Sequence, residues 1–174
     1  ADSLAALEQR VEQEQRFEWA QVAHFLETDW AGTDGERARL TMRNIRRFGS
    51  GRSAADQWAQ RIAQTFTALV KAKPTPDGYD MIPSLFSWAK VIGFGKRLGA
   101  TPDGRHAGEP LSHGPNPAPG FNEGRPGTPT QMIHAVAGVQ PGYGNPAPLQ
   151  LDLDPGLAWD EEAVDRIEAL LLTY

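Results

Sequence analysis

Cysteine is absent from all 174 residues of this sequence. Without it the chain can form no disulfide bond, no thiolate metal site and no cysteine nucleophile. Long apolar runs are absent as well: no stretch approaches the roughly 20 apolar residues that a helix needs to cross a bilayer. No secretory signal opens the sequence. We therefore expect a cytoplasmic protein with no membrane partner and no bound metal.

An excess of positive charge is also missing. The 17 Lys and Arg residues are outnumbered by 22 Asp and Glu residues, which gives a formal net charge of -5. Nucleic-acid-binding domains normally present a broad basic face, so we expect no nucleic-acid partner. Hydrophobic residues make up 40% of the chain and charged residues 22%. That balance is typical of a soluble globular domain rather than a disordered segment.

The first segment, residues 1–78, has the apolar spacing of helices. One amphipathic helix is predicted by residues that recur every three or four positions along one face: Leu4, Leu7, Val11, Gln15, Trp19, Val22 and Leu26. Asp2 or Ser3 can cap the start of this helix, since short polar side chains accept hydrogen bonds from its free amides. Two glycines then predict a break over residues 32–35.

A basic stretch over residues 36–48 follows the break and leads to a further helix. Ser53 is its predicted cap, with Asp56 three residues later in the first turn, where a carboxylate is favoured. Pro and Gly end this helix over residues 74–78 by turn chemistry. The segment is therefore expected to be helical throughout.

The second segment, residues 79–174, changes character. Aromatic and branched residues over 84–94 predict a buried strand. The expected order is a strand over 84–94, a long Gly- and Pro-rich loop over 95–128, a helix from Thr128 to Gly138, a strand over 148–153 and a helix capped by Asp160. Strands alternating with helices indicate an α/β fold.

The charged side chains suggest few sites of their own. Asp152 and Asp154 point to one side of the predicted strand, where two carboxylates can do acid/base work or bind a cation, although a solvated strand edge explains them as well. His106 and His113 lie in the Gly- and Pro-rich loop and could meet a ligand, but two isolated histidines do not make a metal site.

Six arginines form the clearest cluster of charge: Arg37, Arg39, Arg43, Arg46, Arg47 and Arg52. Three of them recur at four-residue spacing, where like charges on one helical stripe repel each other. The sequence predicts acidic partners for them, supplied by Glu12, Glu14 and Glu18 of the first helix. An anionic ligand or a neighbouring subunit is the alternative.

The most specific motif lies over residues 95–110, which read Gly-Lys-Arg-Leu-Gly-Ala-Thr-Pro-Asp-Gly-Arg-His-Ala-Gly-Glu-Pro. Pro, Asp and Gly at 102–104 are a strong turn signal. Arg105 offers a planar fork that can tie loop carbonyls or a carboxylate together. A Gly-Pro-Asn-Pro turn follows at 114–117.

These residues resemble a hallmark of the glycyl radical enzymes, the pyruvate formate-lyase-like class that includes the diol, glycerol, choline and hydroxyproline lyases. In that family a similar Gly-x-Thr-Pro-Asp-Gly-Arg-x-Ala-Gly segment precedes a Gly-x-Asn-Pro or Gly-x-Ser-Pro turn. The matching positions are Gly99, Thr101, Pro102, Asp103, Gly104, Arg105 and Gly108. The resemblance spans nearly the whole chain, with 95–110 as its specific core.

The resemblance implies that residues 1–174 form part of a ten-stranded α/β barrel of the pyruvate formate-lyase type, and that Pro115, Asn116 and Pro117 line the substrate cavity. It implies radical cleavage of a C–C, C–O or C–N bond in a small metabolite, as in formate C-acetyltransferase or the dehydratases. The family's catalytic cysteine and radical-bearing glycine have no counterpart in this sequence, so no catalytic residue is carried over.

We therefore expect an incomplete portion or split subunit of such an enzyme, with no cofactor of its own. The resemblance further implies partners that supply the missing cysteine and glycine segments, an iron–sulfur activase that uses S-adenosylmethionine, and a homodimeric complete enzyme. A degenerate, non-catalytic relative that serves as a binding or assembly module is the alternative. An unrelated acidic α/β enzyme using Asp152 and Asp154 is a third possibility.

Overall fold

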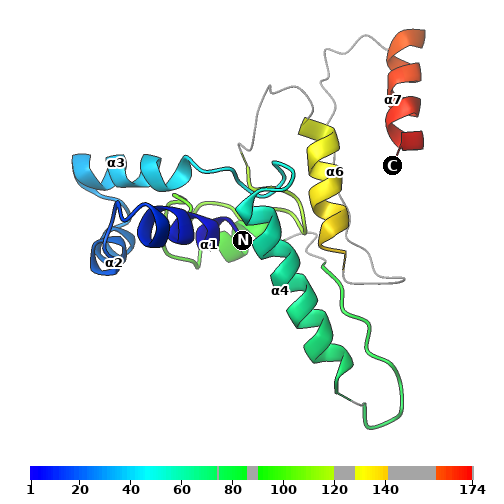
Figure 1. Ribbon diagram of the computed structural model, residues 1–174, viewed down its shortest axis with the longest axis horizontal. Coiled ribbons are helices and arrows are strands. Elements are labelled where there is room, and N and C mark those ends of the chain that lie inside the picture. Colours follow the sequence, from blue (N-terminus) through cyan, green and yellow to red (C-terminus); the bar gives the residue numbers. More distant parts are fainter. Residues whose placement is uncertain (74, 86–89, 120–127, 141–159, 174) are drawn as a thin grey trace.

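The computed structural model describes residues 1–73, 75–85, 90–119, 128–140 and 160–173 (Figure 1). Its helices, in chain order, are α1 (Asp2–Leu7), the π-helix η1 (Glu8–Gln13), α2 (Trp19–Glu27), α3 (Gly32–Arg43), α4 (Ala54–Lys71), α5 (Val91–Gly95), α6 (Thr128–Gly138) and α7 (Glu161–Thr173). Among the described residues, β pairing is limited to an isolated antiparallel bridge between Thr101 and Arg105. None of the described helices combines the length and the apolar character that crossing a membrane requires.

The prediction of one helix from Leu4 to Leu26 is wrong, because the chain turns between η1 and α2. Gln15 adopts a positive φ of 50°, which ends the helical path. Glu18 then starts α2 in a capping box: its side chain accepts from the backbone of Gln21, and the Gln21 side chain accepts from the Glu18 N–H at 2.9 Å. That capping box was the available sequence signal for a new helix.

Two smaller expectations about this half are also wrong. The cap of α1 is Ala1 and carries no side-chain hydrogen bond, so neither Asp2 nor Ser3 caps the helix. Residues 32–35 begin α3 instead of breaking the chain. A Cβ at position 35 would lie 2.4 Å from the carbonyl oxygen of Trp30, so Gly35 lets α3 start directly against the preceding turn.

The helix starts that carry a short polar cap are confirmed. Ser53 accepts from the Asp56 N–H at 3.1 Å, and the Asp56 carboxylate accepts from the Ser53 N–H at 2.8 Å. The α6 helix runs from Thr128 to Gly138 as predicted. Asp160 accepts from the Ala163 N–H at 2.8 Å at the start of α7.

The predicted strand over 84–94 is wrong where it can be compared, since Val91–Gly95 is the short helix α5. A Cβ at position 95 would lie 2.2 Å from the carbonyl oxygen of Glu109, so the helix closes against the loop that follows it. This local packing overrides the strand preference of the side chains. Residues 86–89 and the predicted strand over 148–153 lie outside the described residues.

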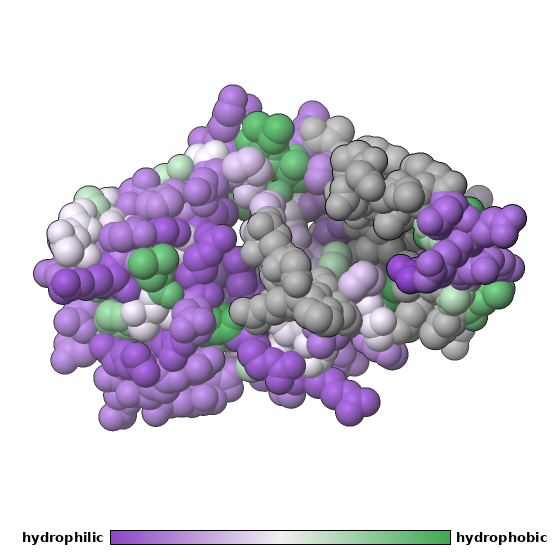
Figure 2. All heavy atoms as spheres, turned by 90° about the horizontal axis from the view of Figure 1, so that it is seen from above, coloured by the Kyte–Doolittle hydropathy of each residue, from purple (hydrophilic) through white to green (hydrophobic). Residues whose placement is uncertain are grey.

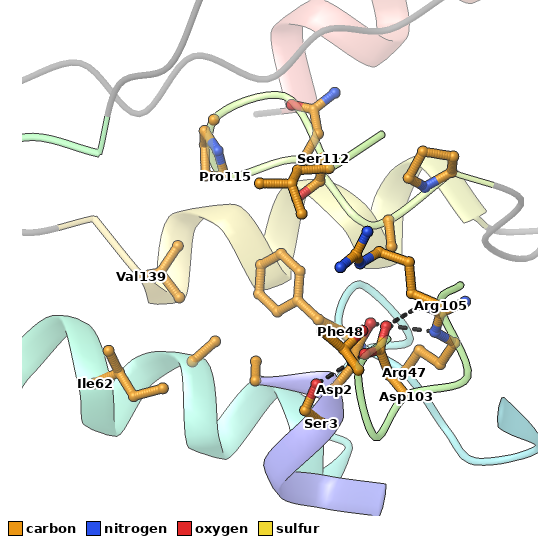
Figure 3. Close-up of a pocket in the computed structure, with 18 of the residues that line it drawn as sticks. Asp2, Ser3, Arg47, Phe48, Ile62, Asp103, Arg105, Ser112, Pro115 and Val139 are labelled. Carbon is orange, nitrogen blue, oxygen red and sulfur yellow. Dashed lines mark hydrogen bonds and ion pairs between the residues drawn. The ribbon is translucent and has the colours of Figure 1, made fainter. Parts of the chain in front are cut away.

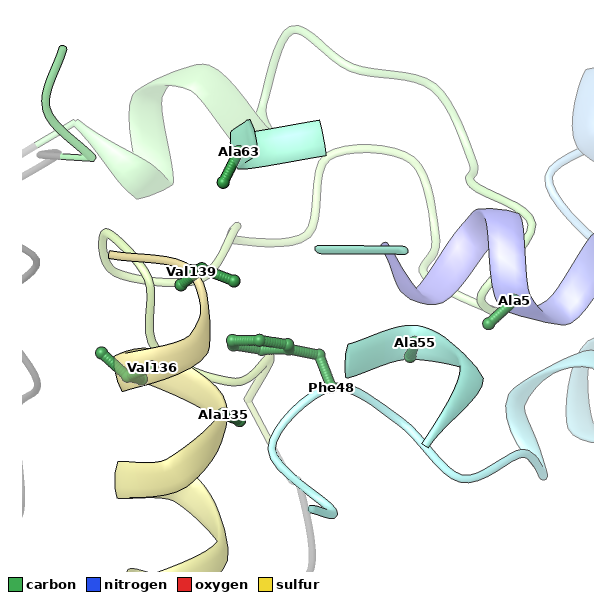
Figure 4. Close-up of a cluster of buried hydrophobic side chains, with 7 residues drawn as sticks. All are labelled: Ala5, Phe48, Ala55, Ala63, Ala135, Val136 and Val139. Atoms are coloured by element: carbon green, nitrogen blue, oxygen red, sulfur yellow. The ribbon is translucent and has the colours of Figure 1, made fainter. Parts of the chain in front are cut away.

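Two clusters of buried side chains form the core, and α1 contributes to both. The first contains Ala5, Phe48, Ala55, Ala63, Ala135, Val136 and Val139 (Figure 4). The second contains Ala6, Val11, Val22, Trp30, Ala38 and Met42. Adjacent helical residues differ by about 100° in direction, so Ala5 and Ala6 face different clusters. The face seen in Figure 2 is mainly hydrophilic over the described helices.

Arg10 connects η1 to the C-terminal end of α3. Its side chain is buried, and its Nε donates to the carbonyl of Thr41 at 3.1 Å. Another guanidinium nitrogen donates to the carbonyl of Asn44, just past α3, while a third pairs with Glu14 at 2.6 Å. A cation at the end of α3 satisfies carbonyls that have no partner in the helix and favours the helix dipole.

Candidate functional site

The motif loop, residues 99–110, is built on the tight turn that its sequence predicts. The Gly104 N–H donates to the Thr101 carbonyl at 3.0 Å, and the Thr101 N–H donates to the Arg105 carbonyl at 3.0 Å. Gly104 has a φ of 79°, which glycine adopts at little cost. The turn therefore needs glycine at this position.

Arg105 holds the inside of the motif loop together. Its side chain is buried, and one nitrogen of the guanidinium donates to the Glu109 carbonyl at 2.8 Å while another donates to the carbonyl of Gly99. The fork expected at this arginine is thus confirmed, with carbonyl oxygens as its acceptors. The indole of Trp30 donates to the Arg105 carbonyl at 3.3 Å and fixes the loop to the second core cluster.

Asp103 fixes the turn of the motif loop to α1. Its carboxylate accepts from the Ser3 hydroxyl at 2.8 Å and lies 3.3 Å from the Arg47 guanidinium. Arg47 also pairs with Asp2 at 3.1 Å, and Asp2 accepts from the Phe48 N–H at 2.7 Å. The side chains of Arg47, Asp2 and Asp103 are 11%, 11% and 13% exposed, so the ion pairs are largely shielded from water.

The arginine partners therefore differ from those predicted. Arg47 lies beyond α3, and its acidic partners are Asp2 and Asp103. Arg39 pairs with Glu36 at 2.7 Å within α3. Glu14 instead pairs with Arg10, which lies four residues earlier at the usual spacing of a helical ion pair, and with Arg16.

The two carboxyls around Arg47 have opposite pKa shifts. Burial raises the pKa of Asp2, and it outweighs the lowering effects of the Phe48 amide and the Arg47 charge. Burial acts on Asp103 in the same direction. The nearby Thr101 side chain, the hydrogen bond from the Ser3 hydroxyl and the charge of Arg47 outweigh it and hold the pKa of Asp103 below its usual range. Asp103 is thus the firmly ionised member of the pair.

The other side of the motif loop is held by Asp29. Its carboxylate accepts from the Ala107 N–H at 2.8 Å and lies 3.2 Å from Nδ1 of His106. The Ala107 hydrogen bond is the main reason that the pKa of Asp29 is lowered, and it outweighs the opposing effect of burial; His106 adds to the lowering. His106 therefore contacts a carboxylate of the protein in this structure.

A cavity of about 830 Å³ lies beside the motif loop (Figure 3). Its apolar lining includes Phe48, Ile62, Phe66, Leu85, Leu111 and Val139. Its charged lining consists of Asp2, Arg43, Arg47, Asp103, Arg105 and Glu109. A largely apolar cavity with a few convergent polar groups is the usual form of a small-molecule site.

Two of the three residues predicted to line the substrate cavity lie in the wall of this cavity. Pro115 and Asn116 line the cavity, whereas Pro117 is buried and is not part of its lining. The Asn116 N–H donates to the His113 carbonyl at 2.8 Å, which closes the turn. That this cavity binds the substrate stays a prediction.

Other candidates from the sequence are not brought into the site. Asp152 and Asp154 lie outside the described residues, and His113 is exposed. In the part of the chain that the structure describes, no three His, Cys, Asp or Glu side chains gather in a way that would hold a metal ion. Sequence reasoning missed Asp2, Ser3 and Asp29 as anchors, because nothing local distinguishes them from solvated residues.

A family model described as pyruvate formate lyase-like matches residues 1–95 of the 174. The chain belongs to this pyruvate formate-lyase-like family, and the family predicted from residues 95–110 is confirmed.

Two curated relatives are dehydratases. The chain is 27% identical to (2S)-3-sulfopropanediol dehydratase of Klebsiella oxytoca over 117 residues, which are 67% of this chain and 14% of that protein. It is 25% identical to trans-4-hydroxy-L-proline dehydratase of Clostridioides difficile over 173 residues, which are 99% of this chain and 21% of that protein.

Two solved structures share the backbone arrangement. A structure describing 1,2-propanediol dehydration in Roseburia inulinivorans matches 98% of this chain with a TM-score of 0.84 and 22% identity. The glycerol-bound B12-independent glycerol dehydratase of Clostridium butyricum matches 77% of it with a TM-score of 0.68 and 28% identity. The matches cover 22% and 16% of those chains. The chain thus spans about a fifth or less of the length of its relatives.

Proposed function

We propose that this chain forms one wall of the substrate cavity in a glycyl radical enzyme of the dehydratase type. Such an enzyme would remove water from a small hydroxylated metabolite by cleaving a C–O bond. Of the three bond types that the sequence leaves open, C–O cleavage is favoured because the named relatives are dehydratases or concern dehydration. The ten-stranded barrel, the homodimer and the cytoplasmic setting belong to this proposal.

The observation that carries the proposal is the position of the cavity. Its wall joins the motif loop, through Asp103 and Arg105, to the Pro115–Asn116 turn that follows it in the sequence. The loop is fixed by the Ser3 hydrogen bond on one side and by the Asp29 carboxylate on the other. A rigid wall of this kind can orient a small polar substrate, because its contacts need no reordering on binding.

Residues 1–174 contain no side chain that could carry the family's thiyl radical. Hydrogen abstraction in the family requires a thiyl radical, and residues 1–174 contain no cysteine. We therefore assign this chain binding and positioning of the substrate only. The cysteine, the glycine that stores the radical, and the activase that uses S-adenosylmethionine and an iron–sulfur cluster are proposed to come from other polypeptide segments.

Asn116→Ala in the complete, activated enzyme tests the role of the wall. The substrates are glycerol, propane-1,2-diol and trans-4-hydroxyproline, assayed without oxygen by mass spectrometry of the dehydrated products. Loss of one polar contact of about 0.5–1.5 kcal/mol lowers kcat/KM about two- to tenfold. Asn44→Ala is the matched control, since the Asn44 side chain is exposed outside the cavity.

Equal kcat/KM values for the two variants would remove Asn116 from the proposed substrate wall. A melting temperature that falls for Asn116→Ala alone would point to a structural role of the turn. Absence of any dehydrated product, from a preparation shown to be complete by intact mass, would favour a non-catalytic relative that serves as a binding or assembly module.

A further inference from the structure

Arginines recur at four-residue spacing at the end of α3 and just beyond it, and they differ in their partners. Arg39 pairs with Glu36 at 2.7 Å, and Arg47 holds the two buried carboxylates described above. Arg43 lies between them as the last residue of α3 and is half-buried. Its side chain forms no ion pair or hydrogen bond with any residue that the structure describes. A half-buried guanidinium without an acceptor favours the approach of an anion.

The unmatched guanidinium of Arg43 belongs to the cavity beside the motif loop. The stem of Arg43 packs against the turn, because a Cβ at position 104 would lie 2.9 Å from the Arg43 Cβ. Arg43 and Arg105 both line the cavity. The acceptors of Arg105 are backbone carbonyls, its Nε is shielded from solvent with no acceptor, and no described carboxylate forms an ion pair with it. Two guanidinium charges in this wall are thus without a carboxylate of their own in the described part of the chain.

The carboxylates in the described lining are already occupied. Asp2 and Asp103 share Arg47 at 3.1 Å and 3.3 Å. Glu109 is exposed, and its side chain accepts from the His106 N–H at 3.0 Å. None of these three acids forms an ion pair with the two unmatched guanidinium groups. An acid group that enters the cavity would therefore not have to displace a carboxylate of the described lining.

The cavity has a charged end and an apolar end. Figure 3 shows Arg105 and Asp103 on one side of the view, and Ile62 of α4 and Val139 beyond α6 on the other. Polar groups gathered at one end of a largely apolar cavity fix the orientation of a ligand. The cavity is thus shaped for a small molecule with its acid group at one end.

We infer that the cavity binds a small hydroxylated acid whose carboxylate or sulfonate group pairs with the Arg43 guanidinium, with the charge of Arg105 adding to the attraction. A planar guanidinium offers paired N–H donors that match the oxygens of such an anion. A neutral polyol of the same size leaves those charged donors poorly matched inside the cavity. The inference rests on the proposed function, because it names the substrate class of the same cavity.

Isothermal titration calorimetry of the complete protein, before radical activation, tests the inference with three related probes. Glycerate and 2,3-dihydroxypropane-1-sulfonate carry an acid group, and glycerol is their neutral counterpart. We expect at least one of the two anions to bind about tenfold or more tightly than glycerol, because a hydrogen bond between charged groups is made only with the anion. The anion that binds more tightly distinguishes a carboxylate site from a sulfonate site.

Arg43→Met separates recognition of the acid group from the shape of the cavity. It should weaken binding of the tighter anion about tenfold or more and change the affinity for glycerol less than about twofold. Arg43→Lys keeps the charge without the planar fork and should retain part of the preference. Arg37→Met is the matched control and should keep the full preference, since Arg37 lies on the same helix, is 78% exposed and is not part of the cavity lining.

Four results would overturn the inference. These are equal affinities of the wild type for the three probes, no binding of any probe, a preference for the anion that survives in Arg43→Met, and an equal loss of affinity for all probes in that variant. Equal affinities are expected if a carboxylate of another polypeptide segment already pairs with Arg43. If Arg43→Met does not fold, the wild-type comparison and Arg43→Lys decide.

The dehydration assay separates this inference from the proposed function. Preferred binding of an anion, with no dehydrated product from the activated enzyme, supports the acid-group site and defeats the dehydratase proposal. Dehydration of glycerol by an enzyme that binds the three probes equally defeats the acid-group site alone.

Discussion

Replacing Arg47 by methionine removes the cation that two buried carboxylates share while keeping most of the side chain's length. Arg47 lies 3.1 Å from Asp2 and 3.3 Å from Asp103, and all three side chains are 11–13% exposed. At these distances each ion pair has an attraction of about 5 kcal/mol at an effective dielectric constant of about 20. Desolvation offsets most of that attraction in the intact cluster.

The variant loses the attraction but keeps two buried carboxylates. Removing one partner of a buried ion pair typically costs about 3–5 kcal/mol, so we expect a loss of about 3 kcal/mol or more in the free energy of unfolding at pH 7. Urea unfolding followed by circular dichroism measures it. Arg37→Met is the control, because Arg37 is 78% exposed and 3.9 Å from Asp34; its expected loss is about 0.5 kcal/mol or less.

A further variant identifies the cause of this loss. Asp2→Asn and Asp103→Asn added to Arg47→Met remove both uncompensated charges and should recover a large part of the lost stability. Two results would refute the reasoning: a loss below about 1 kcal/mol for Arg47→Met, or no recovery in the triple variant. Either would mean that the cluster is effectively solvated.

Two other substitutions test the motif loop. Gly104→Ala should cost about 1–3 kcal/mol, because φ is 79° and the new Cβ would lie 2.9 Å from the Arg39 carbonyl oxygen. Gly93→Ala, within α5 and with open space around the new Cβ, should not destabilise the protein and should stabilise it by up to about 1 kcal/mol in the same urea titration. Asp103→Asn should cost about 1.5–3 kcal/mol at pH 7. Since the pKa of Asp103 is lowered from 3.8 in the folded protein, its stabilising effect is complete above that value and disappears as the pH falls through the folded pKa. The wild type and this variant should therefore converge on acidification, and a gap that stays constant with pH would contradict the assigned charge.

Local sequence signals predicted the elements whose ends are set by local hydrogen bonds. Ser53 with Asp56, Thr128 before Pro129, and Asp160 each place a helix start correctly, because a cap depends on residues only a few positions apart. The turn at Gly104 was predictable for the same reason.

Elements that depend on distant contacts were not predictable. The spacing of three and four residues from Leu4 to Leu26 continues through the turn only with the polar Gln15 as a member, so periodicity alone joins two helical units. Residues 91–95 favour a strand by composition but form α5, which is packed against the carbonyl of Glu109. The start of α2 had a local signal in the Glu18–Gln21 capping box, whereas α5 depends on a contact with residue 109 that local preference does not contain.

The candidate site shows the same division. Arg105 was predicted to tie loop carbonyls, and its partners Gly99 and Glu109 lie within six residues of it. Asp103 contacts Ser3, a hundred residues away, and nothing in the spacing of the chain indicates that pair. Family resemblance drew attention to the loop but not to the residues that anchor it.

Electron paramagnetic resonance of the complete protein tests the central claim most directly. The protein is purified from its source without oxygen and treated with its activating enzyme and S-adenosylmethionine, and its intact mass is recorded in parallel. We predict a glycyl radical signal that changes when the cells are grown on glycine labelled with ¹³C at the α-carbon. A complete, activated preparation that gives no such signal would contradict membership of a working glycyl radical dehydratase.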